Sequence, residues 1–143
     1  MKRSPLKKHS TTEYAIALRS AVIWHRKVVR LVWREKCAFS GPRCGFYGDR
    51  GLEVHHPVPQ SRSVRLKYEV TNGILLCPAH HDKAEADHDL FIQALESKWP
   101  AMYACYLENI ESLNKHSLPL SAVEIKEAVS ELKELCKKLQ RQE

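Results

Sequence analysis

The amino-acid sequence predicts a mostly helical α+β protein, a single domain in which two short strands and the helix after them surround metal-binding residues. Three observations lead to this prediction. The 143 residues and 16.5 kDa suit one domain with a real core. Long amphipathic stretches without Gly or Pro lie near both ends of the chain, which is typical of helices. Cysteines and histidines gather between them, among short apolar runs bounded by turn residues.

Composition excludes two classes of protein. No apolar run approaches the roughly 20 residues of a membrane span, which excludes an integral membrane protein. A hydrophobic content of 43% is too high for a wholly disordered chain. Residues 1–10 are basic, and we expect them to form a disordered tail. No apolar segment with a small-residue cleavage site follows them, so we expect no secretory signal and a cytoplasmic location.

Positive charge is concentrated in the first third of the chain. Residues 1–50 hold twelve Lys or Arg and three acids, a net charge of +9, whereas residues 51–143 have a net charge of −3. A surface of this kind suits a polyanion such as a nucleic acid, because each neutralised phosphate releases counterions. The alternative is a solvated basic helix with a tail, which binds no partner.

Residues 11–36 are predicted to form a basic amphipathic helix. Thr12 suits the N-cap position, and neither Gly nor Pro follows it within this range. At helical spacing one side carries apolar residues, namely Ala15, Leu18, Val22, Val29, Val32 and Trp33. The adjacent side carries Arg19, Arg26, Arg30 and Arg34. We therefore predict one face for the core and one for phosphates, with a solvated face as the alternative for the second.

The middle of the chain is predicted to be strand, loop, strand and helix. Residues 37–51 hold four of the five glycines and should form tight turns. Leu52–His55 and Ile74–Leu76 have the length and apolar character of short strands, and the turn dipeptide Asn72-Gly73 precedes the second. A helix over residues 78–97 can begin at its proline, which suits a first helical turn.

Residues 98–143 are predicted to be helices. One covers residues 101–114, and a short linker over 116–120 follows. Ser121 and Glu124 have the spacing of a capping box that opens the last helix. Its apolar residues alternate spacings of four and three: Ile125, Val129, Leu132, Cys136 and Leu139. Such a seam can pack within the domain or, as the alternative, form a homodimer through the C-terminal helix.

Five cysteines without an export signal favour metal binding over disulfides. A structural zinc takes four nitrogen or sulfur ligands in a tetrahedron, usually from two short knuckles. Cys37 with Cys44, and Cys77 with His80, offer such ligands, so we predict a structural zinc there. The six residues within the first knuckle exceed the usual spacing, and reduced core thiols are the alternative. The two remaining cysteines lie in helical patterns and are expected to be ordinary buried or half-buried thiols.

Two histidine pairs flank the predicted turn between the strands. His55 and His56 are adjacent at the end of a strand and can point to different sides, so one can hold a metal while the other faces a substrate. His80 belongs to the zinc group, whereas His81, at the start of the following helix, can reach across the strand pair toward His55. We therefore predict a second metal ion between His55 and His81.

These residues resemble the motif of HNH endonucleases, which have the ββα-metal nuclease fold, with residues 37–97 as the nuclease core. The matching stretches are LEVHHPVP, then TNGILLC, then the pair His80-His81, in the order and at the spacing of small bacterial and bacteriophage members. The resemblance implies a metal-dependent endonuclease that cuts DNA, with RNA not excluded, and leaves 5′-phosphate and 3′-hydroxyl ends. A zinc-stabilised nucleic-acid-binding module without catalytic activity is the alternative.

The resemblance also implies a role for each motif residue. His55 and His81 would be ligands of a catalytic Mg²⁺ or another divalent cation. His56 would be the general base that takes a proton from water. Asn72 would be an orienting residue, whose amide holds the loop that carries His56. The implied zinc ligands are Cys37, Cys44, Cys77 and His80.

Some positions depart from the family pattern or extend it. His80 stands where a second cysteine is usual, and histidine can also bind zinc. Glu85 stands where some members have a further histidine, and it is either a metal ligand, directly or through water, or a surface acid. The role of His88 stays open. The basic residues expected to contact the DNA backbone from the loop between the strands, with a solvated loop as the alternative, are Arg62, Arg65 and Lys67.

Overall fold

The computed structural model describes residues 12–40, 44, 51–113 and 120–142. Within these ranges the chain is mostly helical, with one two-stranded antiparallel sheet, as predicted. None of the described helices is both long and apolar enough to cross a membrane. The basic tail, most of the glycine-rich turns and most of the linker after residue 114 lie outside the described residues, so these predictions stay open.

Helix α1 (Glu13–Val32) has the predicted N-terminus, since the Thr12 side chain accepts a hydrogen bond from a backbone N–H of the first turn. Its buried face agrees only in part with the predicted one. The buried residues are Ala17, Ala21, His25, Val28 and Val29. Val32, which we expected in the core, is 43% exposed. The prediction of Val29 is confirmed, and Leu18, Val22 and Trp33 pack half-buried against the core. The prediction missed the two alanines and the histidine because it followed the larger apolar side chains.

The C-terminus of α1 comes earlier than residue 36. Arg34 and Glu35 have left-handed φ values of 52° and 55°, which end the helix after Val32. The Glu35 carboxylate folds back onto Arg30, with 2.6 Å between Oε2 and Nη2, and this ion pair stabilises the turn. Arg34 therefore lies outside the helical row of arginines that the sequence predicts.

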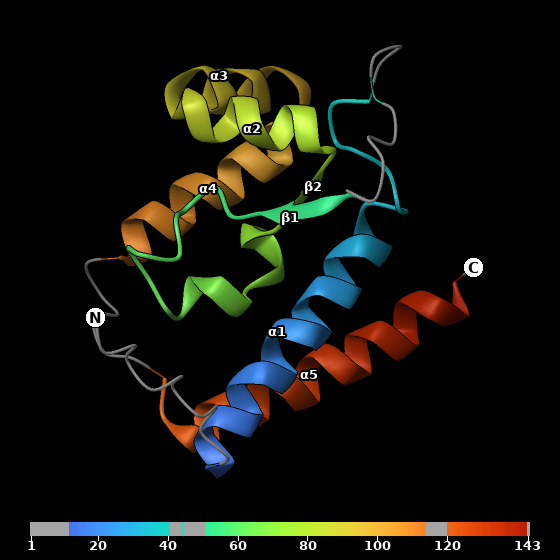
Figure 1. The fold of residues 1–143 in the computed structure, drawn as a ribbon, viewed down its shortest axis with the longest axis vertical. Helices are drawn as coiled ribbons and strands as arrows, with labels where there is room; N and C mark the ends of the chain where they lie inside the picture. The colour runs from blue at the N-terminus through green and yellow to red at the C-terminus, as the bar shows by residue number, and fades with distance from the viewer. Residues whose placement is uncertain (1–11, 41–43, 45–50, 114–119, 143) are drawn as a thin grey trace, which may run out of the picture.

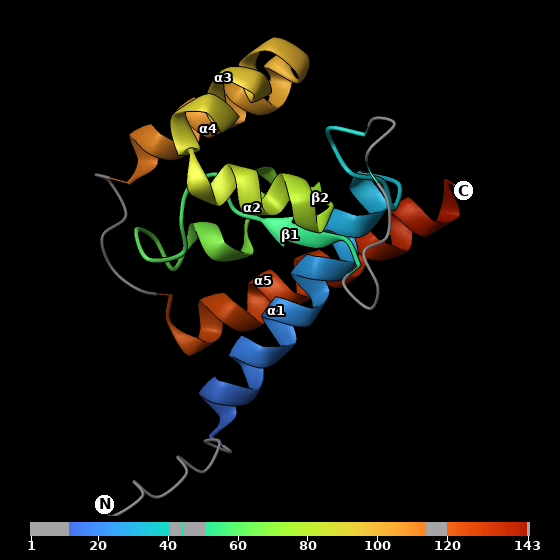
Figure 2. The same ribbon diagram turned by 45° about the horizontal axis from the view of Figure 1, so that its top comes forward.

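Helix α5 (Ala122–Arg141) lies alongside α1 over much of its length (Figures 1 and 2). Ser121 and Glu124 form the predicted capping box at its start. The seam residues buried in clusters with α1 side chains are Ile125, Val129, Leu132 and Cys136. The seam thus packs within the chain. A homodimer through the C-terminal helix remains a prediction, and one that used this same face would have to displace α1.

The sheet lies between α1 and α2 (Pro78–Ala86) (Figure 2). Strands β1 (Glu53–His55) and β2 (Ile74–Leu76) pair antiparallel, with His55 opposite Ile74. The segment between them includes two short 3-10 helices, η1 (Leu66–Tyr68) and η2 (Val70–Asn72). Because alternate strand residues share a face, the first and last residues of β1 both face α2.

The helix predicted over residues 78–97 is in fact two helices, α2 and α3 (His88–Lys98). Asp87 separates them, because its side chain accepts a hydrogen bond from a backbone N–H of α3 and so caps that helix. Helix α4 (Pro100–Ser112) follows. Residues from β2, α2 and α3 form the core of this half of the protein: Ile74, Leu76, Ala84, Phe91 and Leu95. The break turns the chain at the edge of the histidine cluster described below.

Candidate metal centres and the histidine cleft

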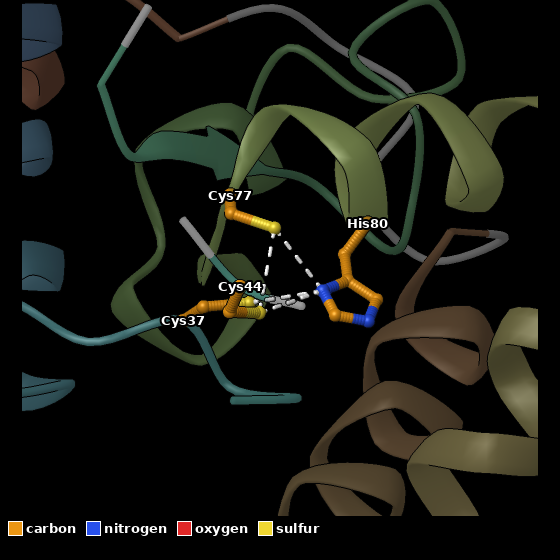
Figure 3. Close-up of side chains that lie close together, drawn as sticks. All are labelled: Cys37, Cys44, Cys77 and His80. Atoms are coloured by element: carbon orange, nitrogen blue, oxygen red, sulfur yellow. Dashed lines mark hydrogen bonds between the residues drawn. The ribbon is translucent and has the colours of Figure 1, made fainter. Parts of the chain in front are cut away.

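The four residues predicted to bind zinc lie together at the N-terminus of α2 (Figure 3). Cys77 is the N-cap residue of α2 and His80 lies in its first turn, while Cys37 and Cys44 belong to the segment after α1. The Nδ1 atom of His80 lies 3.4 Å from Cys37 Sγ, 3.2 Å from Cys44 Sγ and 3.1 Å from Cys77 Sγ. The sulfur atoms of Cys44 and Cys77 are 3.6 Å apart.

These distances suit a tetrahedral metal site. With Zn–S bonds of about 2.3 Å and a Zn–N bond of about 2.0 Å, a regular tetrahedron has S–S edges of about 3.8 Å and S–N edges of about 3.5 Å. The observed edges of 3.6 Å and 3.1 to 3.4 Å are only slightly shorter. The prediction is confirmed to this extent: the chain forms a Cys3His cluster that could hold a metal ion such as zinc.

Local hydrogen bonds lower the pKa of one thiol of the cluster. Burial acts to raise the pKa of Cys77, but hydrogen bonds from the backbone N–H of His80 and from the neighbouring thiols lower it below its ordinary value. Burial raises the pKa of Cys37 to about 11. Since thiolates are the metal-binding form, metal and protons compete at this cluster. The two cysteines outside the cluster are a half-buried Cys105 and a buried Cys136, both free thiols.

A second group of possible metal ligands lies in a cleft of about 440 Å³ beside β1, α2 and the start of α3. His55 of β1 and His81 and Glu85 of α2 have donor atoms within 4.8 Å of one another. His81 and Glu85 are one helical turn apart and so share a face. His56 and His88 also line the cleft. The structure therefore brings together both predicted ligands of the second ion.

His55 carries an unsatisfied polar atom. Its side chain is buried, and its Nε2 has no hydrogen-bond partner among the described residues. A buried polar atom without a partner lowers the free energy of unfolding by about 1–3 kcal/mol, unless a bound group such as a metal ion becomes its partner. Burial, followed by the nearby His81, lowers the pKa of His55 to about 4, so the ring is neutral near neutral pH. A neutral imidazole nitrogen without a partner suits a metal ligand.

Glu53 orients His81, a role that the sequence analysis did not assign. Its Oε2 lies 3.2 Å from His81 Nδ1, and His81 Nε2 lies 3.7 Å from Glu85 Oε1. A carboxylate that accepts from one ring nitrogen fixes the tautomer and leaves the other nitrogen for a metal. The sequence held the signal, since Glu53 and His55 are two residues apart on one strand and therefore share a face.

His56 is held in one tautomer by two hydrogen bonds. Its Nε2 lies 3.1 Å from the backbone carbonyl of Lys67, and its Nδ1 lies 3.2 Å from the side-chain amide nitrogen of Gln60. Because a carbonyl only accepts, Nε2 carries the proton and Nδ1 carries the lone pair. Burial, followed by the nearby His25, lowers the pKa of His56 to about 4. The ring is therefore neutral near neutral pH, with Nδ1 as its basic atom.

Asn72 holds the loop that follows His56. The side chain is 1% exposed, and its Oδ1 accepts from the backbone N–H of Val58 at 2.9 Å. Its Nδ2 donates to the carbonyls of Val58 at 3.0 Å and Leu66 at 3.2 Å. One buried amide thus links the end of β1 to η1. These contacts are of the kind that the orienting role would require.

No protein-family model, curated protein or solved structure matches this chain. The HNH assignment therefore stays a hypothesis based on the motif residues.

Glu85 and His88, whose roles the sequence left open, both lie at the cleft. The Glu85 side chain is 64% exposed, so it stands on the solvent side of the His55–His81 pair. His88 opens α3, and its Nε2 lies 3.4 Å from the hydroxyl oxygen of Tyr106 on α4. Glu85 thus completes a three-ligand group, whereas His88 contributes to the cleft wall.

The basic residues predicted to contact nucleic acid differ in their surroundings. Arg30 pairs with Glu35, and Arg65 pairs with Glu124 of α5 at 2.9 Å. Lys67 is half-buried, with its ammonium 5.6 Å from the centre of the Tyr68 ring. The exposed members are Arg19, Arg26, Arg34 and Arg62. Exposed guanidinium groups are accessible to a phosphate without a change in the fold, so these four are the stronger candidates.

Proposed function

We propose that this protein is a metal-dependent endonuclease of the HNH type, which hydrolyses phosphodiester bonds of DNA and leaves 5′-phosphate and 3′-hydroxyl ends. One observation supports this proposal above the others. A three-ligand group of His55, His81 and Glu85 shares a cleft with His56, a neutral imidazole whose basic nitrogen is fixed. Phosphodiester hydrolysis needs a cation near the phosphate and a base near the water, and the cleft can supply both.

A divalent cation held by His55, His81 and Glu85 would neutralise the charge that develops on the phosphate and the leaving oxygen. The donor set fits such an ion. The Nε2 atom of His55, which has no hydrogen-bond partner among the described residues, would bind the ion, and Glu53 already orients His81. Three protein ligands also leave room for substrate. Two imidazoles and one carboxylate suit Mn²⁺, Ni²⁺ or Zn²⁺ as well as Mg²⁺.

His56 would take the proton of the attacking water at Nδ1. Its Nε2 stays bound to the carbonyl of Lys67, which also stabilises the positive charge that the ring gains. The amide of Gln60 occupies Nδ1 in the resting protein, so Gln60 has to release this atom when water arrives. A base positioned in this way contributes about 10²- to 10⁴-fold to the rate.

The Cys3His cluster would serve the structure of the cleft. It joins the segment after α1 to the first turn of α2, where His80 directly precedes His81. Loss of the metal there would release the N-terminal end of α2 and, with it, one ligand of the catalytic ion. The cluster is therefore expected to be necessary for activity without taking part in the reaction.

The alternative is a zinc-stabilised nucleic-acid-binding module without catalytic activity. Such a module needs the Cys3His cluster and the exposed arginines, and the structure is compatible with both needs. It gives no reason for a buried, partnerless His55 nitrogen beside an oriented His56. Both functions predict that Arg26→Gln weakens DNA binding more than Arg65→Gln, because Arg65 is already paired with Glu124. Fluorescence anisotropy with a labelled duplex measures this difference.

Nicking of supercoiled plasmid tests the proposal. The wild-type protein is incubated with Mg²⁺, Mn²⁺ or EDTA, beside His56→Ala and Glu85→Gln, and beside Glu96→Gln as an exposed control on α3. We expect nicking that requires the divalent cation, persists in the control and falls at least about 100-fold in His56→Ala. Zinc content and circular dichroism establish that the variants are folded.

Two results would contradict the proposal. Equal nicking by wild type and His56→Ala would show that another base, or a contaminant, is responsible. Binding without cleavage of plasmid, branched DNA and RNA, under each of the metals, would favour the binding module.

A further inference from the structure

We propose that His25 of α1 is a positioning residue for His56. The two imidazole rings are stacked, with 5.4 Å between their centres and 15° between their planes. They come from different parts of the fold, since His25 lies on α1 and His56 follows β1. The consequence for catalysis rests on the proposed function, whereas the orientation of His56 can be measured without it.

His25 is itself held rigidly. Its side chain is 3% exposed, and its Nε2 donates to the backbone carbonyl of Glu69 at 2.9 Å. The carbonyl belongs to the turn between η1 and η2, so its position is set by these two elements. The bond to it therefore fixes the rotation of the His25 ring. A buried ring with one fixed hydrogen bond is a firm surface for a second ring to pack against.

Helix α1 is anchored where His25 meets the sheet. The Trp33 indole N–H donates to the carbonyl of Gly73 at 3.0 Å. A Cβ atom on Gly73 would lie 2.5 Å from Cγ2 of Val29 and 3.3 Å from Cε1 of His25, so the missing side chain lets α1 approach this closely. The glycine of the Asn72-Gly73 turn therefore helps to place His25 over His56.

The stack supplies a restraint that the hydrogen bonds of His56 do not. Hydrogen bonds at imidazole nitrogens are strongest near the ring plane, so the bonds to the Lys67 carbonyl and from the Gln60 amide mainly fix where the nitrogens point within that plane. They resist tilting of the ring out of that plane only weakly. The nearly parallel face of His25 blocks this tilt on one side. An element outside the predicted nuclease core of residues 37–97 thus completes the support of the base.

Three substitutions of His25 separate its ring from its hydrogen bond. His25→Ala removes both, His25→Phe keeps an aromatic ring, and His25→Gln keeps a donor without a ring. Long-range ¹H–¹⁵N NMR spectra of the full-length, zinc-loaded protein near neutral pH report the tautomer of His56 directly. In the wild type we expect one protonated and one unprotonated nitrogen. Leu95→Ala is the control, because it removes a buried side chain of α3 that is in none of the described contacts of His25 or His56.

The expected result is specific to positioning. The two nitrogen signals of His56 should move toward an average in His25→Ala and His25→Gln, and should stay apart in His25→Phe and Leu95→Ala, even where the melting temperature falls. Unchanged His56 signals in both His25→Ala and His25→Gln would overturn the proposal. So would signals that follow the melting temperature through all four variants, since His25 would then be a structural residue only.

Cleavage provides the second readout where the chain proves to be a nuclease. We expect His25→Ala to lower kcat by about tenfold, less than loss of the base itself, with KM for DNA and the affinity for Mn²⁺ unchanged. In a His56→Ala background the same substitution should have no further effect. Full additivity of the two substitutions would contradict the proposal. The NMR result does not depend on cleavage, so failure of the proposed function leaves it interpretable.

Discussion

Asn72 offers a quantitative test of how the cleft is held, because its side chain forms three hydrogen bonds while only 1% exposed. Asn72→Ala removes all three. At a net value of about 1 kcal/mol each, the loss is about 3 kcal/mol of unfolding free energy, and more if the N–H of Val58 stays without a partner. Proteins of this size have about 5–15 kcal/mol in total, so a fall in melting temperature of about 10 °C is expected.

Asn72→Asp should be worse than Asn72→Ala at neutral pH. The new carboxylate can still accept from the N–H of Val58, but it would face the carbonyls of Val58 and Leu66 where Nδ2 now donates. This environment raises the pKa of the introduced carboxyl in the folded protein above its unfolded value. The folded variant then binds more protons than its unfolded chain does at this position, so its loss of stability relative to wild type at the same pH should shrink as the pH falls from about 7 to about 5.

Urea unfolding followed by circular dichroism at both pH values measures these effects. Asn109→Ala is the control, since that side chain makes a single 3.5 Å contact with Thr71 and should change stability by less than about 0.5 kcal/mol. The reasoning fails if Asn72→Ala lies within about 1 kcal/mol of wild type. It also fails if Asn72→Asp is the more stable of the two variants at neutral pH.

Three further predictions concern the metal centres and the cleft histidines. Glu53→Gln should weaken Mn²⁺ binding by about 10- to 100-fold in calorimetry, because His81 loses its carboxylate partner, while Glu96→Gln leaves the affinity unchanged. Chelation of the metal from the Cys3His cluster should lower the melting temperature and release about one zinc per chain, and excess zinc should restore both. The pKa of His55 and of His56 is about 4 in the folded protein against an ordinary 6.5, so the unfolded chain binds more protons between these values. The stability of the protein without a divalent cation in the cleft should therefore fall as the pH drops from about 6.5 to about 4, and His55→Ala should flatten this dependence; a slope that the substitution leaves unchanged would count against it.

The features that sequence predicts best here are those set by local chemistry. The β1 and β2 strands follow from short apolar runs beside turn residues, and the capping box of α5 follows from Ser121 and Glu124. The Cys3His cluster could be predicted because the second knuckle, Cys77 with His80, has a spacing that tetrahedral metals use. In each of these cases the deciding residues are neighbours in the chain.

The remaining features depend on contacts between distant segments. The stack of His25 on His56 joins α1 to the end of β1, and no local pattern distinguishes a histidine on a helix face from a solvated one. The buried face of α1 was predicted only in part, because packing against α5 covers the alanines of α1 as well as its larger apolar side chains. The break between α2 and α3 arises because Asp87 caps α3 and does not continue α2. Helix propensity alone does not decide between these two positions for an aspartate.

The central claim is that His56 acts as a base beside a bound divalent cation in one cleft. Single-turnover cleavage of an end-labelled DNA by saturating wild-type protein and His56→Ala, in Mn²⁺, tests it most directly. We predict a rate at least about 100-fold lower for the folded variant, with equal DNA affinity and with 5′-phosphate ends on the wild-type product. Equal rates for the two proteins, with zinc content and DNA affinity intact, would contradict the claim.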